Sequence, residues 1–282
     1  MKKDEQKTAY CFLLPSLSGT AVFVFLPFMD VIRRSFFQVV GGKFVGFQNY
    51  QDVLVNAAFQ QALLHTVKFL GVCLRVLLSL SFGLAVAIYR LSNGRKWIES
   101  VFLLPMAIPV ASIVVFWKIL FHDNGVLNQI LSWFHLAGKD WMNSEAAFVV
   151  LVGTYGWKNL GYDMVLWLAG LAAISDEQYE AAKVSGANSF QTFWYITLPQ
   201  MKQSAVMIGV LSFINAFRVF REAYLIAGEY PHNSIYMLQH LFNNWFTKLD
   251  IQKMSAAAVM MAAVISILLV LLEWWNAKEE LE

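Results

Sequence analysis

The sequence predicts an all-α, polytopic membrane protein with six transmembrane helices. Of its 282 residues, 58% are hydrophobic and only 14% are charged, and the mean hydropathy of +0.53 is far above that of an ordinary soluble domain. Apolar stretches long enough to cross a bilayer, roughly 20 residues each, recur along the chain. A polar segment with helix-capping residues separates the fourth stretch from the fifth, which predicts a helical hairpin outside the membrane.

The expected helices follow from windows of about 20 mainly apolar residues. Their ranges are 9–32, 62–89, 97–121, 146–168, 204–227 and 255–275. No linker, charge block or short repeat divides the chain, so residues 1–282 are expected to form a single transmembrane domain. The first apolar run is long and lacks a small-residue cleavage site, which favours an uncleaved helix over a signal peptide.

Basic residues predict the orientation of these helices, because they are favoured on the cytoplasmic side. Lys2, Lys3 and Lys7 precede the first helix, and the turn at 90–96, between the second and third helices, is also basic. Basic residues in the first outer loop weaken the pattern. The interpretation is a cytoplasmic N-terminus, which places the hairpin between helices four and five inside the cell.

Several functional classes are disfavoured by composition. The net charge of +2 is small and the basic residues are scattered, which argues against nucleic-acid binding. Cys11 and Cys73 both lie in apolar segments and are interpreted as small buried hydrophobes. No phosphate-binding loop and no H-E-x-x-H motif is present, so we expect neither an enzyme nor a metal site.

The expected hairpin carries two helix-start signals and one stop. Ser175 followed by Gln178 has the form of a capping box, which predicts a short helix beginning just after the serine. Gly186 would end that helix, because glycine accepts the left-handed backbone of a helix terminus. Asn188 followed by Gln191 repeats the capping signal and predicts a second short helix.

The second short helix is amphipathic. Its larger apolar side chains are Phe190, Phe193, Trp194 and Ile196, and Pro199 disfavours its continuation. A helix of this kind, held between two membrane spans, suits a groove in another protein. The alternative is an interfacial helix that rests on lipid headgroups.

The hairpin resembles the EAA loop of bacterial ABC importer permeases. The matching residues are Glu180, Ala181, Ala182, Gly186, Ile196, Leu198 and Pro199. Ser185 stands where that family usually has an aspartate. The resemblance implies a coupling helix docked in a cytoplasmic ATPase subunit, with Glu180, Ala181, Ala182, Gly186 and Pro199 in the coupling surface.

Most of the chain is similar to the sugar-transporting, maltose-type branch of these permeases. The similarity rests on "FVGFQNY" at 44–50, "FLLPMAIP" at 102–109, "WLAGLAAISDEQYEAA" from 167 and "AYLIAGEYP" from 223. It implies one of two permease subunits of an ATP-driven sugar or oligosaccharide importer in a bacterial inner membrane, working by alternating access. The implied partners are a second homologous permease, two ATPase subunits that bind ATP and magnesium, an external solute-binding protein and membrane lipid. No cofactor is expected in this chain itself.

Polar residues within two spans are candidates for binding the substrate. Tyr155, Lys158, Asn159 and Tyr162 follow i, i+3, i+4, i+7 spacing and share one helical face. In the fifth span, Ser212 and Asn215 are three residues apart. Amides, hydroxyls and aromatic rings suit a sugar, whereas hydrogen bonds between helices are the structural alternative. The maltose-type resemblance places these positions, together with Met106, at the sugar site.

Charged residues within the spans also need partners. Lys68 and Lys118 are expected to extend their ammonium groups to the interface from near helix ends. Arg75 lies nearer the middle of its span, where pairing with a neighbouring helix is the expectation.

Other functions remain open at this point. An ABC permease for another polar solute, such as a glycerol-phosphate ester, is the nearest alternative. An ion-coupled secondary transporter would need inverted repeats and matching broken helices, which the sequence does not show. A purely structural anchor would leave the polar faces of the fourth and fifth spans unexplained.

Overall fold

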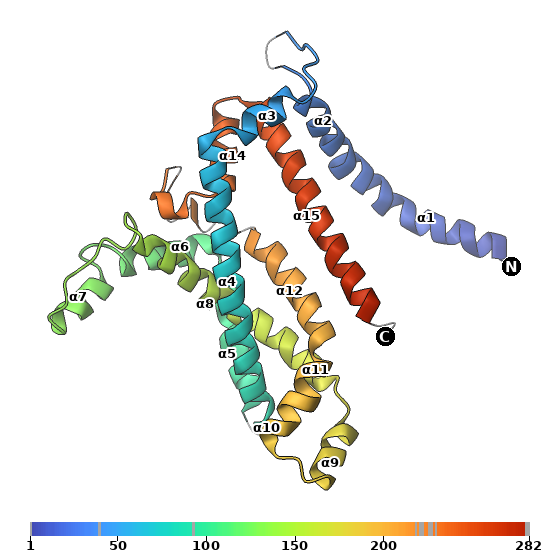
Figure 1. The fold of residues 1–282 in the computed structure, drawn as a ribbon, viewed down its shortest axis with the longest axis vertical. Coiled ribbons are helices and arrows are strands. Elements are labelled where there is room, and N and C mark those ends of the chain that lie inside the picture. The colour runs from blue at the N-terminus through green and yellow to red at the C-terminus, as the bar shows by residue number, and fades with distance from the viewer. Residues whose placement is uncertain are drawn as a thin grey trace. The chain divides into compact units, whose positions relative to one another are not determined.

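The computed structural model describes residues 2–38, 41–91, 94–217, 219, 223–224, 228 and 230–279. The regular elements in these ranges are all helices, which confirms the all-α class (Figure 1). The chain divides into two compact units. Unit 1 consists of Met1–Gln60 and Leu241–Val270, and unit 2 of Gln61–His240 and Leu271–Glu282. The single transmembrane domain stays a prediction.

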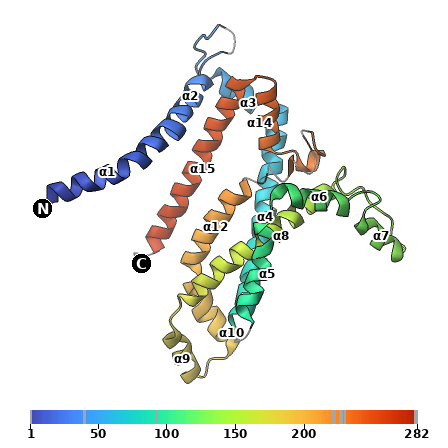
Figure 2. The ribbon, with the colours of Figure 1, turned by 180° about the vertical axis from the view of Figure 1, so that it is seen from behind.

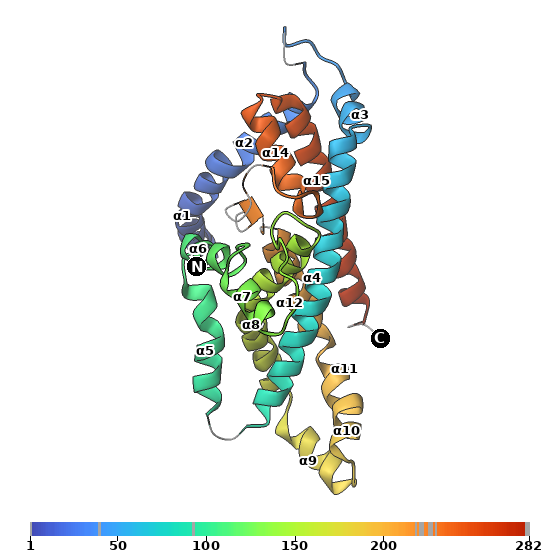
Figure 3. The same cartoon turned by 90° about the vertical axis from the view of Figure 1, so that its left-hand side faces the viewer.

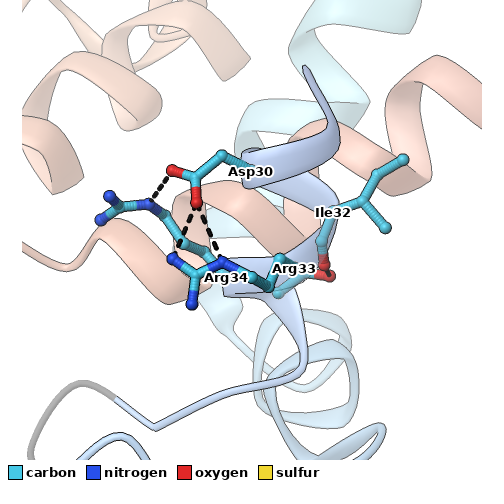
Figure 4. A network of polar contacts seen from close by, with 5 residues as sticks. Asp30, Ile32, Arg33 and Arg34 are labelled. Atoms are coloured by element: carbon cyan, nitrogen blue, oxygen red, sulfur yellow. Dashed lines mark hydrogen bonds and ion pairs between the residues drawn. The ribbon is translucent and has the colours of Figure 1, made fainter. Parts of the chain in front are cut away.

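Unit 1 begins with a continuous helical segment. It consists of α1 (Lys2–Thr20), the π-helical turn η1 (Ala21–Phe25) and α2 (Leu26–Ser35). Near its end, Asp30 accepts hydrogen bonds from Arg33 and from Arg34, at 2.7 and 2.5 Å for the closest pair of atoms in each case (Figure 4). Both oxygens of this carboxylate are therefore engaged by guanidinium groups of the same helix.

The "FVGFQNY" segment forms a small aromatic cluster in unit 1. It leads into α3 (Gln48–Leu54), where the side-chain amide of Asn49 donates to the backbone oxygens of Ser35 and Phe37 at 2.8 and 2.9 Å. The Tyr50 hydroxyl lies 2.7 Å from the Ser35 hydroxyl. These bonds join α3 to the end of α2. Most of α14 (Leu238–Thr247) and α15 (Ile251–Glu279) also belongs to this unit.

Unit 2 contains the candidate site. Its elements are most of α4 (Ala57–Tyr89), α5 (Arg95–Ala107), α6 (Val110–Leu120), α7 (Val126–Trp133), α8 (Ala146–Ala172), α9 (Asp176–Val184), α10 (Ser189–Thr192), the π-helical turn η2 (Phe193–Thr197), α11 (Leu198–Gln200), α12 (Lys202–Phe217) and the 3₁₀ helix η3 (Asn233–Ile235). Figures 2 and 3 show α4, α5 and α12 running lengthwise, with α9 and α10 at one end of them, and Figure 2 shows α8 running obliquely across α4 and α5.

Two buried clusters hold unit 2 together. One contains Phe69, Leu77, Leu151 and Tyr155, and the other contains Trp167 with neighbours on α4, α8 and α12. The Trp167 indole N–H donates to the Ser81 hydroxyl at 3.0 Å, so the second cluster also contains a polar tie between α4 and α8. The second cluster therefore packs α8 and α12, the helices that precede and follow the hairpin, against α4.

The expected spans correspond to helices, but not all of them to separate straight spans. Three helical segments are long and apolar enough to cross a membrane, namely Phe12–Ser35, Ala57–Tyr89 and Ile251–Leu272. In α8, Lys158, Asn159 and Asp163 interrupt the apolar run, and α12 is described only as far as Phe217. Part of the fifth span, at 218, 220–222 and 225–227, lies outside the described residues. The count of six therefore stays a prediction.

The expectation of one continuous helix at 97–121 was wrong. The segment breaks into α5 and α6, whose axes differ by 91°. Ile108 has an extended backbone with φ −80° and ψ 132°, because the ring of Pro109 disfavours a helical conformation in the residue before it. Pro109 then precedes α6 directly, as the cap of the new helix.

Candidate functional site

The hairpin begins with α9, which ends in a glycine-dependent cap. Gly186 has φ +77°, and its N–H donates to Lys183 O at 3.0 Å while the N–H of Ala187 donates to Ala182 O at 3.0 Å. This pair of bonds is the Schellman arrangement, which satisfies carbonyls that a helix end would leave free. The predicted role of Gly186 in ending the first short helix is confirmed.

The two predicted capping boxes have different outcomes. Asn188 and Gln191 form one, with reciprocal bonds of 2.9 Å from each backbone N–H to the other side chain. The box at Ser175 and Gln178 was wrong, because Ser175 precedes the helix without a side-chain capping bond. The Gln178 side chain instead accepts a hydrogen bond from Gln200, in the second arm of the hairpin.

The expected stop at Pro199 was also wrong. The chain stays helical through Gln200, because the π-helical turn η2 immediately precedes the proline segment. In a regular α-helix the proline ring would clash with the carbonyl four residues earlier. The wider turn, in which the N–H of Leu198 bonds to Phe193 O, accommodates the ring. The same order, a π-helical turn and then a proline, occurs at η1 and Pro27.

The hairpin arms are tied together and present an exposed surface. The hydroxyls of Tyr179 and Thr197 lie 3.3 Å apart, which joins α9 to η2. A cavity of about 400 Å³ lies between the hairpin and the end of α4. Glu180, Ala181, Gly186 and Pro199 are exposed, whereas Ala182 is buried. Large apolar side chains are exposed as well, including Val184, Phe190 and Tyr195. A partner that covered the hairpin would bury these side chains.

The predicted polar face lies on the single helix α8. Tyr155 is buried and packs edge-to-face on Phe69 of α4, with ring centroids 5.8 Å apart. The Asn159 side-chain amide donates to Tyr155 O at 2.9 Å, while Lys158 and Tyr162 are half-buried. Tyr155 therefore belongs to the packed interior, whereas the other three side chains are only partly buried.

The residues predicted from other helices occupy different environments. Ser212 of α12 is buried and donates to the Asp163 carboxylate of α8 at 2.7 Å. Asn215 is half-buried on α12, and Met106 is exposed on α5. The structure therefore brings Ser212 to Asp163 and leaves Asn215 and Met106 with accessible surface.

Asp163 and Gly161 are the residues of this region that sequence reasoning missed. Asp163 follows Asn159 by four residues, so its place on the polar face was visible as a carboxylate within an apolar stretch. Gly161 lies where α8 crosses α5, and a Cβ atom there would be 2.0 Å from the backbone oxygen of Phe102. Only a residue without a side chain permits this crossing.

The loop between α6 and α8 is organised by one side chain. The Asn128 amide donates to the backbone oxygens of Asp123 and Lys139 at 2.8 and 2.9 Å, and its oxygen accepts from the Trp141 indole at 2.8 Å. Nearby, the backbone N–H of Asn143 hydrogen-bonds to Asp140 and lowers the pKa of that carboxyl below its usual value. The loop therefore has a defined shape.

The site offers binding groups rather than reactive ones. Amide, phenol and ammonium groups line the half-buried part of α8. Among the described residues, no group of three His, Cys, Asp or Glu side chains could hold a metal ion. The arrangement suits hydrogen bonding to a polar solute within a helical membrane protein.

Comparisons with known proteins agree with this fold. Residues 79–278 match the family described as binding-protein-dependent transport system inner membrane component. The chain is 31% identical over 268 residues to the trehalose/maltose transport system permease protein MalF of Thermococcus litoralis, covering 92% of this chain and 90% of that relative. It is 27% identical to the arabinooligosaccharides transport system permease protein AraP of Halalkalibacterium halodurans, covering 94% and 86%.

A solved structure shares the fold. It is the bacterial alginate ABC transporter in complex with an alginate pentasaccharide-bound periplasmic protein, with a TM-score of 0.82 at 21% identity over 96% of this chain and 94% of the matched chain. The family match covers most of this chain, and the hairpin lies within it. The protein is therefore a multi-pass membrane permease, not an enzyme, and belongs to the family of inner-membrane components of binding-protein-dependent transport systems.

Proposed function

We propose that this chain is one of two permease subunits of an ATP-driven importer for a sugar or oligosaccharide, with its N-terminus in the cytoplasm. The observation that carries the proposal is the hairpin 176–200, capped at both short helices, joined across its arms and exposed on the surface. Such a rigid element between α8 and α12 can transmit motion from an ATPase subunit to the helices that carry the polar side chains. Relatives named for trehalose, maltose and arabino-oligosaccharides support the choice of solute.

The proposal includes partners on both sides of the membrane. Two cytoplasmic ATPase subunits would bind ATP and magnesium and hydrolyse the nucleotide, since this chain has no phosphate-binding loop. A second permease would complete the pathway. A solute-binding protein would deliver the sugar, as the periplasmic protein of the alginate transporter supports. The defined loop around Asn128 gives such a protein a preformed surface.

Within this chain, the proposed sugar contacts are Lys158, Asn159, Tyr162, Asn215 and Met106, which keep accessible surface. Tyr155 and Ser212 would act through packing and through the bond to Asp163 instead. The coupling contacts are proposed for the exposed residues Glu180, Ala181, Gly186 and Pro199, with Ala182 supporting them from inside.

Changing the polar face is expected to impair uptake. Asn159→Leu or Tyr162→Ala removes hydrogen-bonding groups, each worth roughly 0.5–1.5 kcal/mol or more when the partner is left unsatisfied. Uptake of labelled sugar at low concentration should fall about tenfold, which corresponds to roughly 1.4 kcal/mol. The matched control is Val149→Ala, an exposed apolar position on the same helix. Wild-type uptake in both variants, at normal membrane levels, would exclude this face from the pathway.

The orientation predicts a specific labelling pattern. Ser189 begins α10 and is exposed, so a cysteine there is accessible from whichever side the hairpin faces. In a Cys11→Ser, Cys73→Ser background, Ser189→Cys should resist a membrane-impermeant thiol reagent in intact cells and react in inverted vesicles. Reaction in intact cells would reverse the orientation and remove the coupling role.

A further inference from the structure

One face of α4 is not covered by other helices of unit 2. This face carries small residues and one arginine. Its exposed positions include an i, i+4 ridge made of Gly71, Arg75, Ser79, Gly83 and Ala87. A Cβ atom added at Gly71 or Gly83 would meet no atom within 4 Å. Small residues in such a ridge allow another helix to approach closely in a membrane.

The ridge continues into two grooves at the hairpin end of α4. One, of about 560 Å³, is lined by Ser79, Trp167 and residues of α11 and α12, among others. The second, of about 660 Å³, is lined by Gly83 and Ala87 together with Phe190 and other hairpin residues. The uncovered face is therefore concave where it meets the hairpin.

Arg75 restricts which partner can pack on this face, because its guanidinium group needs hydrogen-bond acceptors. It lies 18 residues after Ala57 and 14 before Tyr89, so it is close to the middle of the helix. Its side chain makes no hydrogen bond or ion pair among the described residues. An arginine at that depth needs acceptors, which lipid tails cannot provide.

Three carboxylates of the apolar helices are already engaged by other side chains. Asp30 is held by two arginines of its own helix, Glu99 bonds to Arg95 at 2.7 Å, and Asp163 accepts from Ser212. The apolar segment Ile251–Leu272 of α15 contains no acidic residue. Among the residues whose side chains the structure describes, these helices therefore leave no free carboxylate for Arg75.

We propose that the face of α4 made of Gly71, Arg75, Ser79, Gly83 and Ala87 packs against a transmembrane helix of the second permease subunit, which presents a carboxylate to Arg75. This inference rests on the proposed function, because it requires that subunit. The glycines let the two helices approach, and the ion pair fixes their register. Lys68 does not share this need, because its ammonium lies 4.8 Å from the ring centroid of Phe148 in the same unit.

The test is co-purification of this chain on a tagged second permease. Arg75→Leu is expected to lower the recovered amount about tenfold or more, the effect of losing one strong contact, while its level in the membrane stays normal. Arg75→Lys should restore most of the recovery. The matched control, Lys68→Leu on the same helix, should stay close to wild type. In the purified complex, a photo-crosslinking amino acid at Ser79 should capture the second permease, identified by its tag.

The outcomes separate the two proposals. If the wild-type complex forms but Arg75→Leu is recovered like wild type, the ion pair is excluded and the proposed function stands. Crosslinks from Ser79 only within this chain, to lipid, or to an identical copy would likewise overturn the assignment of the face. If the wild-type chain recovers neither a second permease nor ATPase subunits, the proposed function fails and this inference fails with it.

Discussion

Gly161→Val is expected to prevent α5 and α8 from packing and to abolish uptake. The added Cβ would lie 2.0 Å from the backbone oxygen of Phe102, and a backbone cannot move aside as a flexible side chain can. Overpacking usually costs about 1–3 kcal/mol, and a clash with backbone should reach or exceed the upper value. The thermal stability of the purified subunit and its membrane level should both fall.

Gly153→Val is the matched control for this variant. Gly153 belongs to the same helix, and a Cβ there would meet nothing within 4 Å. Its stability should stay close to that of the wild type. Equal melting temperatures and equal uptake for Gly161→Val and Gly153→Val would contradict the crossing of α5 and α8 described above.

Gly186→Val is expected to uncouple ATP hydrolysis from transport. The residue has φ +77°, a conformation that costs a β-branched side chain roughly 1–3 kcal/mol. The damage should stay local, because each membrane helix satisfies its own backbone hydrogen bonds. The variant should reach the membrane, yet hold its ATPase subunits weakly or show hydrolysis that loaded binding protein no longer stimulates.

Gly94→Val carries similar backbone strain outside the hairpin. Gly94 has φ +82° at the start of α5, and a Cβ there would also meet nothing within 4 Å. This control should retain stimulated hydrolysis. Normal subunit retention and normal stimulation in Gly186→Val would mean that the hairpin has another role.

Local signals in the sequence were sufficient for the parts of the fold that depend on neighbouring residues. The cap at Asn188 and the left-handed Gly186 could be predicted because each depends on residues within one or two turns. The break at Pro109 was missed because the apolar pattern continues on both sides of it and outweighs a single proline in a window of 20 residues. The π-helical turn before Pro199 gives no comparable periodic signal.

The candidate site was predictable only as a set of residue types. Periodicity placed Asn159 and Tyr162 on one face of a helix, but it could not show that Ser212 is engaged by Asp163, since that bond joins α8 to α12 across 49 positions of sequence. The same holds for Gly161, whose role depends on α5 crossing α8. Contacts between helices decide which polar residues remain free to meet a solute.

Uptake into proteoliposomes tests the central claim most directly. The complete complex, with this chain, the second permease and the ATPase subunits, would be reconstituted with the binding protein outside and ATP inside. We predict accumulation of labelled sugar that requires both ATP and the binding protein and is lost in Gly186→Val. Sugar accumulation that proceeds without ATP and follows an imposed ion gradient, or its complete absence in an intact complex with loaded binding protein, would contradict the account.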